Sequence, residues 1–178
     1  MQAAPPAVFR FPGGSAGDNY HWANGGTPTT GSGMYIMADD TFDNFMTRLV
    51  NPVPGATAMC IVNYGTNAAG TAGGDPNEAA AWVNYANNTK HYGVKYWEIG
   101  NEIYGNSEYG GNWEADKHAC QTPTCYGQNA VAFIQAMKAK DPTIKCSVVL
   151  CAPGNWPDGA APDWNTNVLA ACGSSIEP

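Results

Sequence analysis

The amino-acid sequence predicts an α/β fold in which about four parallel strands alternate with helices. A single domain is expected to span residues 1–178. Short apolar runs of strand length alternate along the chain with segments of helical periodicity. Polar residues follow these runs, as they do at the carboxyl ends of parallel strands in open doubly wound sheets and in barrels. The hydrophobic content of 44% is enough to bury a core, so a folded chain is predicted.

The chain is predicted to begin with a short strand and a long loop. The strand covers residues 8–11 and stops at Pro12-Gly13-Gly14. The loop that follows runs to about Met37 without regular structure, and loops of this length are usually functional or disordered. It carries polar and aromatic side chains that suit a binding surface, namely Asp18, Tyr20, His21 and Trp22. We expect His21 to act as a hydrogen-bonding loop residue and not as a base.

The remaining elements alternate between helix and strand. Asp39 or Asp40 is expected to cap a helix that ends before Pro52. Its core residues are predicted from their spacing to be Phe42, Phe45, Met46 and Leu49. The further elements, in chain order, are a strand at 58–62, a helix at 76–89, a strand at 94–99, a wet aromatic loop at 101–125, a helix at 126–140, a strand at 144–150 and a weak helix at about 163–171. The alternation predicts a parallel sheet with right-handed crossovers.

Composition excludes several classes of partner. The chain has 8 Lys and Arg against 15 Asp and Glu, so no basic stripe is available for nucleic acid. No apolar run approaches the roughly 20 residues that cross a bilayer, so no membrane partner is expected. The N-terminus lacks the features of a secretory signal, but the polar, lysine-poor composition is typical of secreted carbohydrate-active proteins. We therefore expect a secreted or periplasmic protein whose signal peptide lies outside this sequence.

The cysteine spacing predicts one disulfide and no metal site. Cys120 and Cys125 bracket a short turn that can close as a disulfide in an oxidising compartment. The other cysteines and the histidines do not form the two close ligand pairs of a structural zinc site, so no metal is expected. Cys60 and Cys146 are predicted to be small buried residues in strands. No phosphate-binding glycine motif follows a strand, and no cofactor is expected.

One carboxylic acid stands at a strand end where chemistry is expected. The strand at 94–99 places Trp97 on one face and Glu98 on the other, and Asn101-Glu102 follows it. An acid at the mouth of a barrel, beside an aromatic wall and partly desolvated, can hold a proton near neutral pH and donate it to a leaving oxygen. Glu102 is therefore a candidate proton donor for glycoside cleavage. A glutamate after a strand is more often a solvated loop residue or a helix cap.

Several stretches of the sequence resemble a known enzyme family. Trp97-Glu98-Ile99-Gly100-Asn101-Glu102 resembles the strand-four signature of the clan of retaining (β/α)8 glycosidases. Phe9-Arg10-Phe11-Pro12-Gly13-Gly14 resembles the strand-two signature of the α-L-arabinofuranosidases in that clan. The similarity continues through Asn63-Tyr64-Gly65-Thr66 and residues 139–145 and covers most of the chain. It points to arabinofuranosidase-like members of family fifty-one and implies a partial TIM barrel, a half barrel made of strands two to five.

The resemblance implies a role for each matched residue. Glu102 would be the general acid/base, Asn101 would hydrogen-bond a sugar hydroxyl beside the anomeric carbon, and Arg10 would organise charge near the nucleophile. Arg10 could instead form a structural ion pair, and Asn101 could simply end the strand as a turn residue. Because Arg10 and Glu98 lie on the inner face of alternate strands, we expect these two side chains to pair.

Other side chains after the strands are candidates for binding the sugar. They are Trp22, Asn63, Tyr64, Tyr104 and Trp113. The aromatic residues of this set could stack on sugar rings. Aromatic residues buried under long loops are at least as common, so a packing role remains the alternative.

The nucleophile of a retaining mechanism is expected to be missing from this chain. The family places it after strand seven, whereas the chain carries strands two to five. A retaining mechanism needs two carboxyl groups about 5 to 5.5 Å apart. The sequence thus indicates a catalytic-domain fragment of an enzyme for α-L-arabinofuranosides or related plant polysaccharides. The alternatives are an inactive carbohydrate-binding half-barrel scaffold and a cellulase or xylanase of the same clan.

Four β/α units would leave two open strand edges and one uncovered sheet face. We therefore expect a homodimer, in which the strand at 8–11 meets the strand at 144–150 of the second copy or the two inner faces pack together. The alternative is that loops such as 19–37 fold over the face and keep the chain monomeric.

Overall fold

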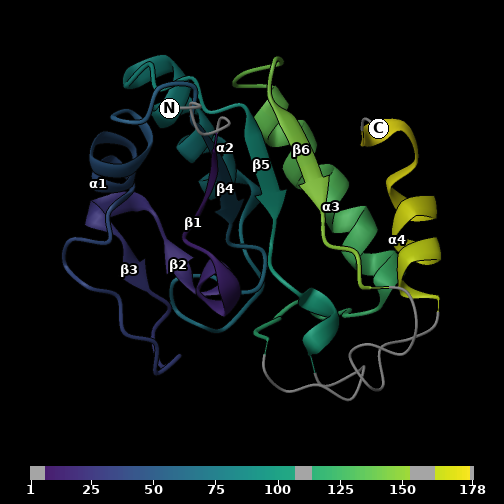
Figure 1. The fold of residues 1–178 in the computed structure, drawn as a ribbon. Coiled ribbons are helices and arrows are strands. Elements are labelled where there is room, and N and C mark those ends of the chain that lie inside the picture. The colour runs from purple at the N-terminus through teal and green to yellow at the C-terminus, as the bar shows by residue number, and fades with distance from the viewer. Residues whose placement is uncertain (1–6, 107–113, 153–162, 177–178) are drawn as a thin grey trace.

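The computed structural model describes residues 7–106, 114–152 and 163–176, and its centre is a four-stranded parallel sheet. The strands are β1 (Val8–Phe11), β4 (Thr57–Val62), β5 (Tyr96–Ile99) and β6 (Lys145–Val148), which lie side by side in that order (Figure 1). All three neighbouring pairs are parallel, so the predicted strand order and direction are confirmed. β5 and β6 are shorter than the strands predicted at 94–99 and 144–150.

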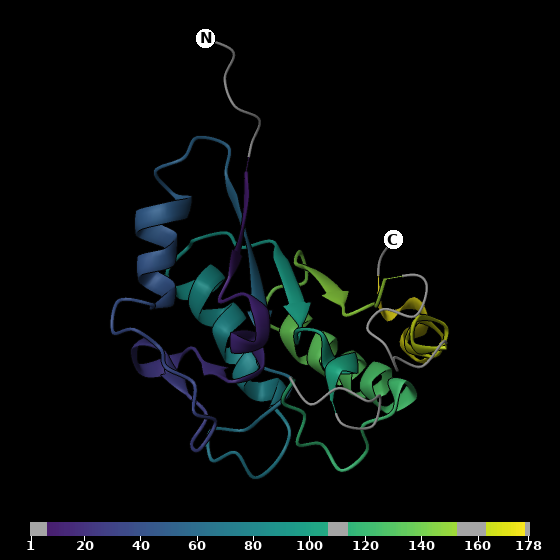
Figure 2. The same ribbon diagram turned by 60° about the horizontal axis from the view of Figure 1, so that its bottom comes forward.

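Helices cover one face of this sheet (Figures 1 and 2). They are α2 (Pro76–Val83), which continues as the π-helical η4 (Asn84–Thr89), and α3 (Pro123–Lys138), while α4 (Trp164–Cys172) packs against α3. α3 begins three residues before the predicted start at Tyr126. The reason is local, because the Thr122 side chain accepts a hydrogen bond from the Cys125 backbone nitrogen and Pro123 suits the first helical position.

The first helix differs in detail from the prediction. It consists of α1 (Phe42–Asn44) and the π-helical η3 (Phe45–Val50). The predicted cap at Asp39 or Asp40 is wrong, since Thr41 Oγ1 accepts the hydrogen bond from the Asn44 backbone nitrogen. The predicted burial of Leu49 is also wrong, because this side chain is 52% exposed. A π-helical turn bonds residue i to i+5, so the spacing that aligns side chains in an α-helix no longer holds.

The loop after β1 is more ordered than the sequence predicted. It contains the short helical turns η1 (Gly14–Asp18) and η2 (Ala23–Gly25) and an antiparallel pair, β2 (Tyr20–His21) with β3 (Thr27–Pro28). The buried side chains of Asp18, Tyr20 and His21 anchor it to the rest of the molecule. The remaining short elements are η5 (Ile103–Gly105) and η7 (Gly173–Ser175).

Aromatic side chains fill the layer between the sheet and its helices. Trp82 of α2 lies at the centre of one cluster and contacts five rings, those of Phe11, Tyr20, Trp22, Phe42 and Trp97. Such ring pairs add to the stabilisation that burial provides. Cys60 of β4 is fully buried as predicted, and burial raises the pKa of its thiol above the usual value. Cys146 of β6 is only half-buried.

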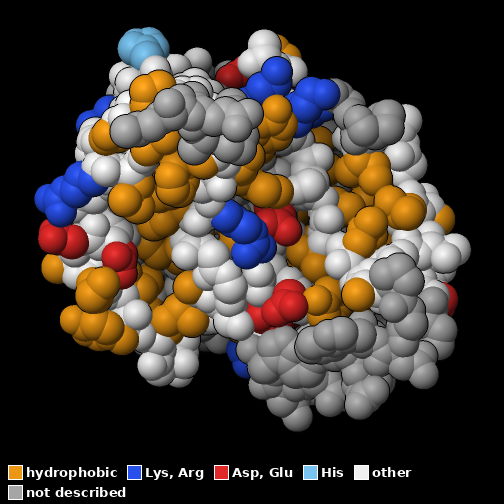
Figure 3. Space-filling model, in the orientation of Figure 1, with side chains coloured by type: hydrophobic (Ala, Val, Ile, Leu, Met, Phe, Trp, Pro, Cys, Tyr) orange, Lys and Arg blue, Asp and Glu red, His pale blue; other side chains and the backbone are white. Residues whose placement is uncertain are grey.

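The opposite sheet face is turned towards the viewer in Figure 1. On β1 and β5 exposed or half-exposed side chains alternate with more buried ones, and Val8, Arg10, Tyr96 and Glu98 lie on the open side. Figure 3 shows hydrophobic side chains spread over this face, with oppositely charged ones side by side near its centre. Gly17 of η1 covers part of β4, because a Cβ at this glycine would lie 2.7 Å from Ile61 Cγ2.

Two further sequence predictions concern covalent and membrane structure. Cys120 and Cys125 form a disulfide, as predicted from their spacing. The bonded segment runs into the first turn of α3 and is not a free turn. Within the described residues, no helix is both long and apolar enough to cross a membrane.

Candidate active site

Arg10 and Glu98 form the predicted pair on the open face of the sheet. Arg10 Nε lies 2.8 Å from Glu98 Oε2, although β4 separates their strands. Arg10 Nη2 also donates a hydrogen bond to Asn101 Oδ1 at 2.9 Å. A single guanidinium from β1 therefore joins the end of β5 to the turn that follows it.

That turn, Gly100-Asn101-Glu102, has an unusual backbone. Gly100 has φ +77°, and a Cβ there would lie 2.9 Å from Tyr64 Cβ, so glycine is required. Glu102 has φ 40° and ψ 36°, a left-handed conformation that is uncommon for a residue with a side chain. Such conformations cluster at functional sites and persist only where surrounding contacts enforce them.

Glu102 lies at the carboxyl end of β5, as predicted. Its side chain is half-buried, and the Tyr104 hydroxyl donates a hydrogen bond to Glu102 Oε1 at 2.9 Å. Burial raises the pKa of the Tyr104 hydroxyl, and the neighbouring Glu102 carboxyl raises it further. The hydroxyl therefore keeps its proton and stays a donor. Tyr104 and Glu102 thus form one hydrogen-bonded pair, and the neighbouring residue Asn101 is hydrogen-bonded to Arg10.

A second acid, Glu114, belongs to the same cluster and was missed by the sequence analysis. Glu114 Oε1 accepts hydrogen bonds from Ser15 Oγ at 2.6 Å and from Asn101 Nδ2 at 2.9 Å. Glu114 Oε2 is buried and has no hydrogen-bond partner among the described residues. Burial raises the pKa of Glu114 to about 7, the two hydrogen bonds lower it in part, and the nearby Glu102 raises it.

A third acid, Asp18, lies beneath the turn. It is completely buried, and its two carboxyl oxygens accept hydrogen bonds from the backbone nitrogens of Gly65 (3.1 Å) and Asn101 (2.8 Å). Asp18 thereby ties the ends of β4 and β5 to η1. Burial raises its pKa well above the usual value, and the charge of Glu114 acts in the same direction.

His21 and Asn63 belong to a buried polar network that joins Asp18 through Thr66, whose hydroxyl donates to the Asp18 carbonyl at 2.7 Å. His21 Nδ1 lies 2.9 Å from the Glu78 carboxyl, and Nε2 lies 3.0 Å from Thr29 Oγ1. Asn63 Nδ2 lies 3.3 Å from His21 Nε2, and Asn63 Oδ1 accepts a hydrogen bond from the Thr66 backbone nitrogen. His21 is thus a hydrogen-bonding loop residue, as predicted. The side-chain partners of Asn63 in this network are His21 and Thr66.

The other aromatic candidates lie in packed surroundings. Trp22 stacks on Trp82 with ring centroids 6.1 Å apart, and its Nε1 donates to the Glu78 carbonyl. Tyr64 is fully buried and stacks on His118 at 4.2 Å. Trp113 lies outside the described residues. The structure therefore groups Tyr104 with Glu102, while the rings of Trp22 and Tyr64 contact other parts of the chain.

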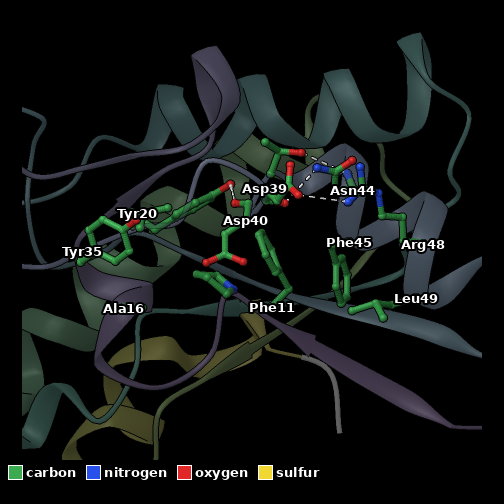
Figure 4. A pocket seen from close by; sticks show the side chains of 13 residues that line it. Phe11, Ala16, Tyr20, Tyr35, Asp39, Asp40, Asn44, Phe45, Arg48 and Leu49 are labelled. Atoms are coloured by element: carbon green, nitrogen blue, oxygen red, sulfur yellow. Dashed lines mark hydrogen bonds and ion pairs between the residues drawn. The ribbon is translucent and has the colours of Figure 1, made fainter.

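A pocket of about 360 Å³ lies beside β1, and Figure 4 shows it. Its wall includes Phe11, Tyr20, Tyr35, Asp39 and Arg48, but neither Asn101 nor Glu102 lines it. No group of three or more His, Cys, Asp or Glu side chains in the described part of the chain is placed to hold a metal ion. The cluster around Glu102 consists of acids, an amide, a guanidinium and a phenol, a set that can bind hydroxyl groups and transfer protons.

Comparison with known proteins identifies similar chains. No protein-family model matches the sequence. A probable α-L-arabinofuranosidase C from Aspergillus fumigatus is 28% identical over 93% of this chain, which spans 32% of that protein. The structure resembles an α-L-arabinofuranosidase from Thermotoga maritima in complex with arabinose, with a TM-score of 0.68, 28% identity and coverage of 96% of this chain and 35% of the other. A family 51 α-L-arabinofuranosidase from Thermotoga petrophila gives a TM-score of 0.66 and 29% identity over the same shares of the two chains.

The chain therefore spans about a third of the length of the relatives that it matches. The sequence-based resemblance to family 51 α-L-arabinofuranosidases is confirmed, and so is the α/β class of the fold with parallel strands in barrel order.

Proposed function

Because the chain is similar in sequence and in fold to family 51 α-L-arabinofuranosidases, we propose that it is part of a glycoside hydrolase that cleaves α-L-arabinofuranosides of plant polysaccharides. Glu102 is the general acid/base of a retaining mechanism in this proposal. Its proton goes to the glycosidic oxygen as the leaving group departs, and Glu102 later takes a proton from the attacking water.

The main support is one hydrogen bond, in which Arg10 of β1 donates to Asn101 in the turn that also holds Glu102. The amide of Asn101 and the carboxyl of Glu102 leave the end of β5 together. The Tyr104 hydroxyl gives the Glu102 carboxyl a defined orientation. A fixed carboxyl beside a fixed amide is the arrangement that general acid catalysis and sugar hydroxyl binding need.

In this proposal, the nucleophile is not among the described residues. Three other acids accompany Glu102 in the cluster, and none is free to attack an anomeric carbon. Asp18 is completely buried, and both of its carboxyl oxygens accept backbone hydrogen bonds. Glu98 is paired with Arg10 at 2.8 Å, and Glu114 has one oxygen in two hydrogen bonds and the other buried. Retaining hydrolysis by this chain alone should therefore be weak or absent.

The test compares the wild-type chain with Glu102→Gln on two substrates. One is 4-nitrophenyl α-L-arabinofuranoside, whose leaving group departs without a proton, and the other is an arabino-oligosaccharide, whose leaving group needs one. General acid catalysis contributes about 10²- to 10⁴-fold, so Glu102→Gln should lose about that much on the oligosaccharide and less on the aryl substrate. Asp39→Asn is the matched control, because the Asp39 side chain is 79% exposed and lies outside the cluster.

The outcomes separate the possible functions. Equal losses on both substrates would contradict a proton-donor role for Glu102. Arabinose binding by the wild type that is unchanged in Glu102→Gln, without hydrolysis of either substrate by the wild type, would favour the carbohydrate-binding scaffold. Residual hydrolysis that Glu102→Gln abolishes would favour the catalytic fragment. Turnover of aryl β-xylosides or β-cellobiosides in place of the arabinofuranoside would favour a xylanase or cellulase. A chain that neither binds nor cleaves any of these sugars would contradict the proposed function.

A homodimer is a further part of the proposal. The strands β1 and β6 form the two edges of the sheet, and the open face includes Val8, which is 60% exposed, and Tyr96, which is 38% exposed. Exposed edges and apolar side chains of this kind favour association with a second copy. Light scattering of a dilute sample should give twice the 18.8 kDa of one chain, and a single-chain mass would contradict the dimer.

Secretion is the last part of the proposal. The Cys120–Cys125 disulfide supports it, because disulfides persist mainly in oxidising compartments. Thiol labelling of unreduced protein recovered from its natural source should leave both cysteines unmodified. Labelling of Cys120 and Cys125 in that sample would contradict an oxidising location.

A further inference from the structure

The contacts of Glu114 set it apart from the other acids of the cluster. Glu114 is 7% exposed, and both hydrogen bonds to its carboxyl end on the same oxygen, Oε1. One donor is Ser15 of η1 and the other is the side-chain amide of Asn101. The loop that follows η5 thus contributes a buried carboxyl to the turn that carries the proposed acid/base.

Asn101 is held from both sides in a way that defines its amide orientation. Its Oδ1 accepts from Arg10 Nη2 at 2.9 Å, and its Nδ2 donates to Glu114 Oε1 at 2.9 Å. A flipped amide would place the Asn101 NH2 group against the guanidinium, donor against donor. It would also place Asn101 Oδ1 against a carboxyl oxygen of Glu114. Both contacts would be lost at once, and buried polar groups without partners are costly.

We infer that Glu114 is a positioning residue of this site, which holds the Asn101 amide with its nitrogen towards Glu114 and its oxygen towards Arg10. The positioning of Asn101 does not depend on the proposed function, and only the consequence for sugar binding rests on it. With Oδ1 on Arg10 and one N–H on Glu114, the second N–H of Nδ2 is the donor that Asn101 offers to a sugar hydroxyl. Glu114 reaches the sugar through Asn101 and does not itself touch the reacting atoms.

The effect of Glu114 on the Asn101 amide can be observed, because Glu114 gains or loses a proton as the pH changes. Burial raises the pKa of Glu114 to about 7, so the carboxyl changes charge near neutral pH. The charged groups around it come from three segments, namely Arg10 on β1, Asp18 in η1 and Glu102 after β5, and Lys117 shares a surface pocket with it. Ionised Glu114 accepts the Asn101 hydrogen bond more strongly than the neutral acid does. The Asn101 amide signals should report that change.

The experiment follows the two Asn101 side-chain N–H signals by ¹H–¹⁵N NMR of the full chain between pH 5 and pH 9. In the wild type, the signals should move with one midpoint near pH 7. Glu114→Gln keeps a carbonyl oxygen that can accept from Asn101 but does not titrate, so the transition should vanish while the signals stay dispersed. Glu114→Ala removes the acceptor, and the two N–H signals should shift towards values for a free amide and exchange faster with water. Ser15→Ala is the matched control, because it removes the other hydrogen bond to Oε1 and should keep the transition. Its midpoint should move to higher pH, since the Ser15 hydrogen bond lowers the pKa of Glu114.

Two results would overturn the inference. One is a Glu114→Gln chain whose Asn101 signals still titrate near pH 7, because another acid would then be responsible. The other is a Glu114→Ala chain with unchanged Asn101 shifts and exchange rates. If Glu114→Ala does not fold, the comparison of wild type with Glu114→Gln decides alone.

L-Arabinose titrations on the same samples separate this inference from the proposed function. Glu114→Ala should weaken binding about tenfold, the effect expected for losing one oriented donor, and Glu114→Gln should bind like the wild type. Expected amide behaviour without any arabinose binding by the wild type would sink the proposed function and leave the inference intact. Arabinose binding that is equally strong in Glu114→Ala would contradict the consequence for the sugar.

Discussion

Two acids in this molecule, Glu114 and Asp43, have pKa values that are shifted in opposite directions. Beneath the strand ends, Glu114 accepts hydrogen bonds from the neutral groups of Ser15 and Asn101, and burial raises its pKa to about 7. Asp43 of α1, in contrast, is partly exposed and lies 2.9 Å from Lys90 Nζ. Partial burial alone would raise the pKa of Asp43. Hydrogen bonds from Lys90 and from two tyrosine hydroxyls outweigh this effect and lower it.

The difference between Glu114 and Asp43 shows what sets the direction in which the pKa of an acid shifts. Both carboxyl groups accept at least two hydrogen bonds, so the number of bonds does not explain the opposite shifts. Asp43 is partly exposed and has a cation nearby, whereas the hydrogen-bond donors to Glu114 are neutral. A fold tolerates such unpaired acids mainly where they serve a site, and these acids surround the turn that carries Glu102.

Replacing Asp18 should have the largest effect on stability. Asp18→Ala leaves the backbone N–H groups of Gly65 and Asn101 buried without an acceptor, and each such loss costs about 1 to 3 kcal/mol. We expect the free energy of unfolding to fall by about 2 to 6 kcal/mol, as measured by urea denaturation. Asp43→Asn serves as the comparison. Equal losses in the two variants would remove the distinction between buried and surface acids.

The pH dependence of stability should show the raised pKa of Glu114. A folded pKa of about 7 lies above the value of 4.5 for an unperturbed glutamate, so the folded state binds the proton more tightly. The resulting stability is fully present below pH 4.5 and is lost as the pH rises through 7. We expect this contribution to amount to roughly 3 kcal/mol and to be absent in Glu114→Gln. Unfolding free energies of both chains between pH 4 and pH 9 test it, and parallel curves would refute it.

Replacing Asp43 should have the smallest effect and the opposite sign in pH. Because the folded pKa of Asp43 is lowered, its contribution is present above the unfolded value of 3.8 and is lost as the pH falls through the folded value. Asp43→Asn should therefore destabilise the chain by less than about 1 kcal/mol at neutral pH. The difference from wild type should shrink in acid and in high salt. A difference that grows with salt would show that contacts other than charge dominate there.

The elements that could be predicted from the sequence are those determined by residues close to one another along the chain. Segments of strand length marked all four strands, and residue parity placed Arg10 and Glu98 on one face, where they pair. Spacing alone indicated the Cys120–Cys125 disulfide. The motif Gly100-Asn101-Glu102 identified the turn at the end of β5. In each case a periodic or short-range pattern carries the information, because strand and turn geometry repeats within a few residues.

The buried acids around the turn could be located only in the tertiary structure. Ser15 and Glu114 are 99 residues apart, and Asp18 and Asn101 are 83 apart, so no local pattern connects them. The sequence likewise did not separate Tyr104, which bonds Glu102, from Trp22 and Tyr64, which pack into other surroundings. Which polar groups become buried together depends on how loops close over the strand ends. The pKa of an acid depends on that burial, because an acid loses contact with water only when the chain folds.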